Sequence, residues 1–237
     1  QKPIVLNVCN FAKGSPTLLS FDDAQTLFHE FGHALHQILS NVTYEPLSGT
    51  SVSRDFVELP SQLFEHWLTV PEVLKRFAVH YKTKSPISEK LMERLIGASN
   101  YDMGYQTVEY TSSALVDLYF HLEDTEKDVM ELQNEILSKI GLPEAIKMRH
   151  ATPHFAHVFS GGYYAAAYYS YMWSEVMDAD AFLAFEELDN PFDADLAKSL
   201  EDNILSKGNS IDPEIAYKRF RGSLPKVDAL LKGRGLI

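Results

Sequence analysis

The segment LFHEFGHALH, residues 27–36, places two histidines four positions apart within an apolar stretch. Residues i and i+4 of a helix lie on the same face, so His29 and His33 are predicted to point at one place where a metal ion can bind. Glu30 is turned away from them by about 100°. Its carboxylate is therefore expected beside the metal rather than on it, where a general base acts on a water molecule.

The surroundings of the two histidines favour a buried helix. Asp22 and Asp23 supply acidic residues at its expected start. No charged residue except Glu30 lies between Thr26 and Leu39, so the helix is expected to be buried on most of its sides. Two histidines that are merely hydrogen-bonded in a core are the alternative. A carboxylate and two imidazoles in a buried helix need a partner, however, and a divalent cation is the expected one.

A third metal ligand is expected from a later helix. The extended metzincin pattern requires a Gly three residues and a His six residues after the second histidine, but His36 and Leu39 occupy these positions. A glutamate from a second helix is the remaining option. Glu58 lies in an apolar stretch, residues 53–68, that follows helical periodicity. Glu58 and the two histidines thus form a predicted His2Glu zinc site with a fourth position open to water.

Two other polar side chains are expected near this site. Glu65 lies two helical turns beyond Glu58 on the same face, where it can accept a proton from a ligating imidazole. A solvated or salt-bridged carboxylate is an equally open alternative for Glu65. His36 shares the face of the two histidines. Because Glu58 and the open position already complete the site, His36 is expected to be a hydrogen-bonding neighbour rather than a ligand.

A second constellation consists of aromatic residues after a Gly161-Gly162 bend. Tyr164, Tyr168 and Tyr171 are spaced i, i+4 and i+7, so a helix over residues 164–187 puts them on one face. A phenol there can donate to the oxygen that becomes negative when water attacks a carbonyl. Packing in a core is the alternative, and it is the expected role of three of the rings: Tyr168, Tyr169 and Trp173.

Five segments carry a resemblance to a known family: residues 27–36, 47–52, 54–58, 60–62 and 65–67. They resemble the thimet-oligopeptidase-like zinc metallopeptidases, and within that family the branch of bacterial dipeptidyl carboxypeptidases (peptidyl-dipeptidases). The likeness extends over essentially the whole chain, from Asn7 to Leu236. It implies a mainly α, zincin-like, multi-helix catalytic domain that cleaves short peptides inside a deep channel.

The resemblance also implies roles for individual residues. His29, His33 and Glu58 correspond to the ligands of one zinc ion per chain, and Glu30 to the general base. A histidine before the glycine pair and two tyrosines seven residues apart contact the substrate and stabilise the oxyanion in the family. These match His157, Tyr164 and Tyr171. The family pattern places the first tyrosine directly after the glycines, which selects Tyr163, whereas the seven-residue spacing selects Tyr164.

The remaining organisation is predicted from periodicity and turn residues. Residues Pro3 to Cys9 and Thr17 to Phe21 are expected to be strands of a small β-ribbon near the active site, joined by a Gly14-Ser15-Pro16 turn. Helices are expected in seven further stretches: residues 53–68, 71–82, 88–120, 125–140, 164–187, 193–206 and 213–221.

Composition limits the class of protein. The 237 residues are 45% hydrophobic without a stretch long enough to span a bilayer, which is typical of a soluble chain of one large domain or two small lobes. The single cysteine excludes an internal disulfide and agrees with a cytoplasmic location. A net charge of -12 argues against nucleic acid and anionic membranes as partners. A monomer that acts on short peptides is expected.

The predicted activity is the release of C-terminal dipeptides. An endo-acting oligopeptidase of the same family is the nearest alternative, and a fragment that binds zinc without hydrolysing peptides is another. Family members are longer and carry the zinc motif past their midpoint, so residues 1–237 are expected to be the C-terminal catalytic part of a larger enzyme. Dipeptide release also requires a cation for the substrate carboxylate, for which the candidates are Arg149, Arg219 and Arg221.

Overall fold

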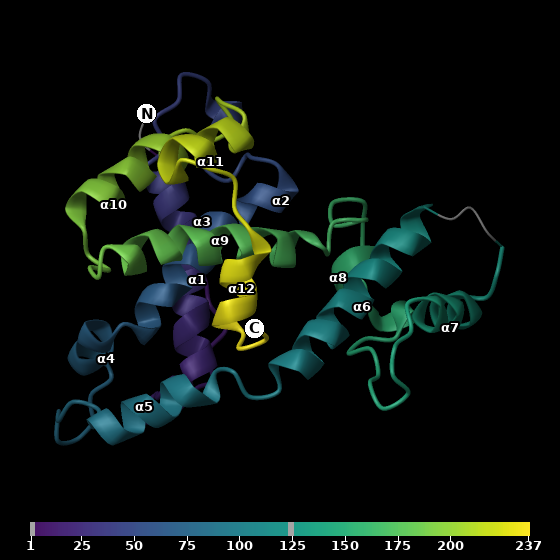
Figure 1. Ribbon diagram of the computed structural model, residues 1–237, viewed down its shortest axis with the longest axis horizontal. Coiled ribbons are helices and arrows are strands. Elements are labelled where there is room, and N and C mark those ends of the chain that lie inside the picture. Colours follow the sequence, from purple (N-terminus) through teal and green to yellow (C-terminus); the bar gives the residue numbers. More distant parts are fainter. Residues whose placement is uncertain (1–2, 123–125) are drawn as a thin grey trace.

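The protein is built from helices. The computed structural model describes residues 3–122 and 126–237, and helices account for nearly all of the regular structure in these ranges (Figure 1). The mainly α class predicted from the sequence is confirmed. The helices are α1 (Phe21–Ile38), α2 (Arg54–Val57), α3 (Leu59–Glu65), α4 (Pro71–Phe77), α5 (Glu89–Ala98), α6 (Met103–Leu122), α7 (Val129–Lys139), α8 (Ala156–Phe159), α9 (Ser170–Glu187), α10 (Ala194–Leu200), α11 (Pro213–Arg221) and α12 (Val227–Gly233), with shorter turns η1 (Glu45–Leu47), η2 (His66–Thr69), η3 (Thr152–His154) and η4 (Glu201–Leu205).

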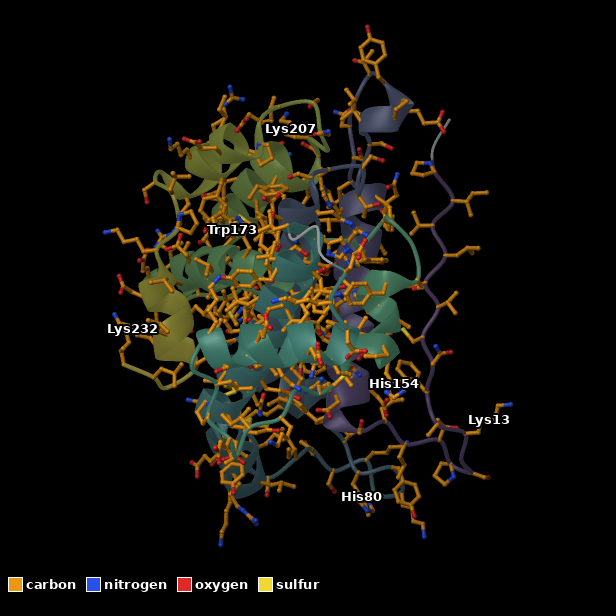
Figure 2. The ribbon with its side chains drawn as sticks, turned by 90° about the vertical axis from the view of Figure 1, so that its right-hand side faces the viewer. Lys13, His80, His154, Trp173, Lys207 and Lys232 are labelled. Carbon is orange, nitrogen blue, oxygen red and sulfur yellow. The ribbon has the colours of Figure 1, made fainter. Side chains whose placement is uncertain are left out.

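The predicted β-ribbon before the first helix is wrong. Residues 3–20 form no strand, and Phe21 is already the first residue of α1. Figure 2 shows this segment as an extended chain along one side of the molecule, past the labelled Lys13. A strand requires backbone hydrogen bonds to a neighbouring strand. Within the described residues the only β-type pairing is an isolated bridge between Val79 and Pro86, so the segment is extended without a partner.

Several predicted helices are shorter or interrupted. The stretch 53–68 divides at Glu58, because Pro60 has no backbone N–H and starts α3 anew. The stretch 71–82 ends at Phe77, and the stretch 88–120 is broken between α5 and α6. The predicted helix from 125 begins at α7, and its first residue lies outside the described ranges. The stretches 193–206 and 213–221 are helical as predicted, whereas α12 was not predicted.

The helix that carries the two histidines is well defined at its start. Ser20 and Asp23 form a capping box: Ser20 Oγ accepts from the backbone N–H of Asp23 at 3.0 Å, and Asp23 Oδ2 accepts from that of Ser20 at 2.9 Å. The expectation that α1 is buried on most sides is wrong. Its buried residues are Gly32, Ala34 and His36, and one apolar side is exposed: Leu27, Phe31 and Ile38.

Two separate groups of apolar residues hold the helices together. Figure 1 shows α9 across the middle of the molecule, with α10 and α11 above it, α12 below it, and α6, α7 and α8 on the right. The main core joins α2 and α3 to α9, η4 and α11; the second core joins α6 to α7. No helix among the described residues is both long and apolar enough to cross a membrane. The main core consists of Phe56, Leu59, Leu63, Met177, Ala181, Phe185, Leu200, Ile204, Leu205, Tyr217 and Phe220, and the second core of Val116, Leu132 and Ile136.

Candidate metal centre

The site depends on the close approach of α1 and α3. A Cβ atom on Gly32 would lie 2.5 Å from Ser61 Cα and 2.6 Å from the Pro60 carbonyl oxygen. These distances are far shorter than any van der Waals contact, so only glycine lets the two backbones touch here. The glycine between the two histidines therefore brings the start of α3 directly against α1.

This packing brings the three predicted metal ligands together. His29 Nε2 lies 3.2 Å and His33 Nε2 lies 3.1 Å from the same oxygen, Oε2 of Glu58. One ligand atom from each of the three residues lies within 4.8 Å of the other two. Bonds of about 2.1 Å to a tetrahedral zinc ion place two ligand atoms about 3.4 Å apart. The arrangement and the chemistry of the donors therefore fit a zinc ion between the three side chains.

Hydrogen bonds hold two of these side chains in position. Glu65 Oε1 accepts from His29 Nδ1 at 2.6 Å, so Nε2 is the nitrogen directed at the site. Glu65 Oε2 in turn accepts from Gln25 Nε2 at 2.5 Å. Ser61 donates its hydroxyl to Glu58 Oε2 at 3.0 Å. The predicted contact between Glu65 and the imidazole of His29 is present, and the two groups are also within ion-pair distance, so the salt-bridged alternative for Glu65 stays open.

Charge at the site is strongly coupled to these contacts. Burial lowers the pKa of His29, but its hydrogen bonds to Glu58 and Glu65 outweigh burial and raise that pKa to about 10. Burial acts in the opposite direction on Glu58, and the hydrogen bonds from His29 and His33 bring the pKa of this carboxyl well below its usual range.

Glu30 and His36 lie close to the ligands but differ in their surroundings. Glu30 is half-buried, and its carboxylate has no hydrogen bond or ion pair with the described residues. Such a carboxylate is available to a water molecule. His36 is completely buried, and neither ring nitrogen has a hydrogen-bond partner within the described part of the chain. The expectation that His36 is a hydrogen-bonding neighbour is therefore wrong. Burial, followed by the nearby His33, lowers the pKa of His36 to about 4.

The structure also brings together the histidine and the tyrosines. The Tyr171 hydroxyl lies 3.2 Å from His157 Nε2, and the ring of Tyr164 lies 4.6 Å from that of His157. Only Tyr171 belongs to a helix, because α9 begins at Ser170. The predicted helical face shared by three tyrosines is therefore wrong, although the rings of all three contact His157. Tyr163 is 74% exposed and Tyr164 is 37% exposed, so the ring in contact with His157 is also the more buried one.

An aspartate that the sequence did not reveal holds the loop of residues 160–169, which lies between α8 and α9 and is called the tyrosine loop below. Asp117 in α6 is fully buried. Its two carboxylate oxygens accept from the backbone N–H groups of Ala166 at 3.0 Å and of Tyr168 at 2.9 Å. Ala166 has a left-handed backbone with φ 55°, which is costly for a residue with a Cβ. No local pattern in α6 singles out Asp117, because its partners lie some fifty residues later.

The arginines proposed from the sequence are largely engaged elsewhere. Arg149 pairs with Glu109 at 3.1 Å, and Arg221 pairs with Glu187 at 2.8 Å. Arg219 is exposed on α11. A fourth arginine, Arg54 of α2, lies over the tyrosine loop and was missed. The sequence could have indicated Arg54, because it lies four residues, or about one helical turn, before Glu58 and so on the same side of the predicted helix.

The sequence of this chain matches one family throughout its length. Residues 1–236 match the model of peptidase family M3. The chain belongs to that family. Together with the convergent ligands, membership indicates a metallopeptidase domain, and the resemblance predicted from the motifs is confirmed.

Several curated proteins are similar to this chain over its whole length. It is 41% identical over 242 residues to dipeptidyl carboxypeptidase of Escherichia coli K12 and 39% identical over 246 residues to oligopeptidase A of the same organism. It is 35% identical over 243 residues to the thimet-like oligopeptidase of Dictyostelium discoideum. These alignments cover 99% or more of this chain but only 35–36% of each relative. The chain thus spans about a third of their length.

Proposed function

We propose that this protein hydrolyses short peptides with one zinc ion held by His29, His33 and Glu58, and that it releases dipeptides from the C-terminus of its substrates. The observation that carries the proposal is the convergence of two imidazole nitrogens on a single Glu58 oxygen, at 3.1 and 3.2 Å. Zinc supplies Lewis-acid chemistry when it is bound, because it lowers the pKa of water and polarises a carbonyl.

Glu30 is the proposed proton carrier. It is next to His29 in α1 but does not belong to the three convergent ligands, and its carboxylate is unpaired within the described residues. A carboxylate in that position takes a proton from the attacking water and gives it to the leaving amine. The carboxylate therefore acts first as a base and then as an acid, and the proton taken from the attacking water becomes the proton of the leaving amine.

Tyr171, Tyr164 and His157 are the proposed stabilisers of the oxyanion. Burial, followed by the nearby Glu58, raises the pKa of Tyr171, so its phenol keeps the proton that it must donate. Burial and the nearby Arg54 lower the pKa of His157, which favours a neutral imidazole. The Tyr171 hydroxyl lies 3.2 Å from His157 Nε2. This neighbour orients the phenol before a substrate carbonyl arrives.

Metal analysis and product analysis test the proposal on the full-length protein. Protein purified without chelator should contain one zinc ion per chain, and the His29→Ala/His33→Ala double variant should contain none. An N-blocked hexapeptide should lose its C-terminal dipeptide, as detected by mass spectrometry. Glu30→Gln should retain zinc and abolish this product. Unchanged zinc in the double variant contradicts the metal site.

The same product analysis decides between two modes of cleavage. The 39% identity to oligopeptidase A supports an endo-acting enzyme as the second candidate. Such an enzyme cuts the hexapeptide at an internal bond, and it does so equally when the C-terminus of the peptide is amidated. Dipeptide release, by contrast, depends on a free C-terminal carboxylate. Products other than a dipeptide and a tetrapeptide would favour the endo-acting candidate.

A further inference from the structure

Arg54 combines a charged head with an almost complete lack of polar partners. Its side chain is half-buried, and its Nε is fully buried without a hydrogen-bond partner among the described residues. The only hydrogen bond of its guanidinium in that part of the chain is a long one, 3.5 Å from Nη2 to the Tyr163 carbonyl oxygen. No described carboxylate forms an ion pair with it. A guanidinium carries five N–H donors, so most of those on Arg54 remain available.

Two tyrosines orient this guanidinium. Its central carbon lies 3.7 Å from the centre of the Tyr163 ring and 4.1 Å from the centre of the Tyr164 ring. The two rings are nearly perpendicular to each other, at 89°, so at most one of them lies parallel to the guanidinium plane, and contacts through ring faces leave the N–H groups at its edge available. The edge is the part that binds a carboxylate through two parallel hydrogen bonds. The contacts therefore present Arg54 as a fixed receptor for a planar anion.

Arg54 also belongs to the same group of side chains as the proposed oxyanion site. Tyr164, one of its two stacking partners, lies 4.6 Å from His157. His157 is in turn the neighbour of the Tyr171 hydroxyl at 3.2 Å. The three contacts form a continuous path from the free arginine edge to the phenol that is proposed to meet the scissile carbonyl.

The distance along the chain suits a dipeptide. Arg54 and Glu58 are four residues apart, with α2 between them, so they lie on one face with a rise of about 6 Å. Two extended residues of a substrate span about 7 Å. A carboxylate that lies two residues beyond a carbonyl at the metal centre is thus at the level of Arg54. Arg149 and Arg221, by contrast, are neutralised by carboxylates of the protein itself.

We propose that Arg54 binds the C-terminal carboxylate of the substrate, two residues beyond the bond that is cut. This inference rests on the proposed peptidase function and extends it, because it names the group that limits the product to a dipeptide. It also specifies the substrate class: short peptides with a free C-terminus, rather than amidated peptides or internal segments of longer chains.

A pair of peptides that differ only at the C-terminus tests this role in the zinc-loaded, full-length protein. Arg54→Ala should lower kcat/KM about 10- to 100-fold for an N-blocked tetrapeptide with a free carboxylate, because a hydrogen-bonded charge pair is lost. It should change kcat/KM little for the corresponding C-terminal amide. Arg94→Ala is the matched control, since it removes the same charge from the exposed surface of α5 and should leave both values unchanged.

A binding measurement makes the test independent of turnover. The free dipeptide should bind the wild-type protein at least 10-fold more tightly than the dipeptide amide, as measured by calorimetry, and Arg54→Ala should abolish that preference. Equal losses of kcat/KM for acid and amide peptides would overturn the inference, because they show that Arg54 only supports the tyrosine loop. A wild-type protein that cuts internal bonds contradicts the proposed dipeptide release, and the dipeptide-binding preference then decides the role of Arg54 by itself.

Discussion

At the scale of single residues, Glu65 determines which nitrogen of His29 is available to a metal. It accepts from Nδ1 at 2.6 Å and is itself held by Gln25, so the imidazole has one orientation. We expect Glu65→Ala to lower zinc affinity about 10- to 100-fold, because such supporting contacts typically contribute that much. Titration with a competing chelator measures the loss. Glu30→Gln is the control and should retain the wild-type affinity; an equal loss in both variants contradicts the separate roles.

His36 gives the protein a stability term that depends on pH. Burial lowers its pKa in the folded chain from 6.5 to about 4, so the unfolded chain binds the proton more tightly. The contribution of His36 to the unfolding free energy is therefore complete above pH 6.5 and is lost as the pH falls toward 4. At pH 5 the loss is about 2 kcal/mol. His36→Leu should remove this part of the pH dependence.

Urea unfolding of the metal-free protein at pH 7 and pH 5 measures the effect of His36. The difference in unfolding free energy between the two pH values should be about 2 kcal/mol smaller in His36→Leu than in the wild type. The other titrating groups are common to both proteins and cancel in this comparison. An identical pH dependence in the two proteins contradicts the assignment to His36.

At the scale of elements, the contact between α1 and α3 is decided by Gly32. An added methyl group meets backbone atoms at 2.5 and 2.6 Å, and backbone cannot give way as a flexible side chain does. Gly32→Ala should therefore destabilise the fold by about 1–3 kcal/mol. It should also weaken zinc binding at least 10-fold, because α3 must move away from α1 and Glu58, which directly precedes α3, moves with it. Thermal unfolding and zinc titration measure the two effects.

Gly97 of α5 provides the matched control for this substitution. A Cβ there meets no atom within 4 Å, so Gly97→Ala should be neutral or stabilise by up to about 1 kcal/mol without changing zinc affinity. If both alanine variants behaved alike, the effect at Gly32 would reflect helix propensity rather than the contact between the two helices.

At the scale of the whole molecule, the two cores should contribute separately to the site. Ile136 belongs to the second core and Leu63 to the main core, which contains the start of α3. Either residue changed to alanine should cost about 2–5 kcal/mol in unfolding free energy. Only Leu63→Ala should also weaken zinc binding. Denaturant titration and chelator competition measure the two properties, and a loss of zinc affinity in Ile136→Ala would show that the cores are coupled.

Much of the proposed metal centre could be predicted from the sequence, because it depends on helical periodicity over short distances. His29 and His33 are four residues apart on the single helix α1, so they share a face whatever the rest of the chain does. The mainly α class follows from the same periodicity. The boundaries of α2, α9 and α5 were less predictable, since a helix of uniform pattern can be interrupted at one residue without a change in composition.

Other features depended on contacts between distant segments, and only the tertiary structure decided them. Asp117 meets the backbone of residues 166–168, and Arg54 meets the ring of Tyr164, more than a hundred residues later in the chain. Such partners leave no local pattern. The expected ribbon is a further example, because a short apolar stretch such as residues 3–9 indicates an extended backbone but not whether a second strand lies beside it. The sequence by itself thus determined the candidate ligands, because their spacing is local, and the tertiary structure determined what surrounds them.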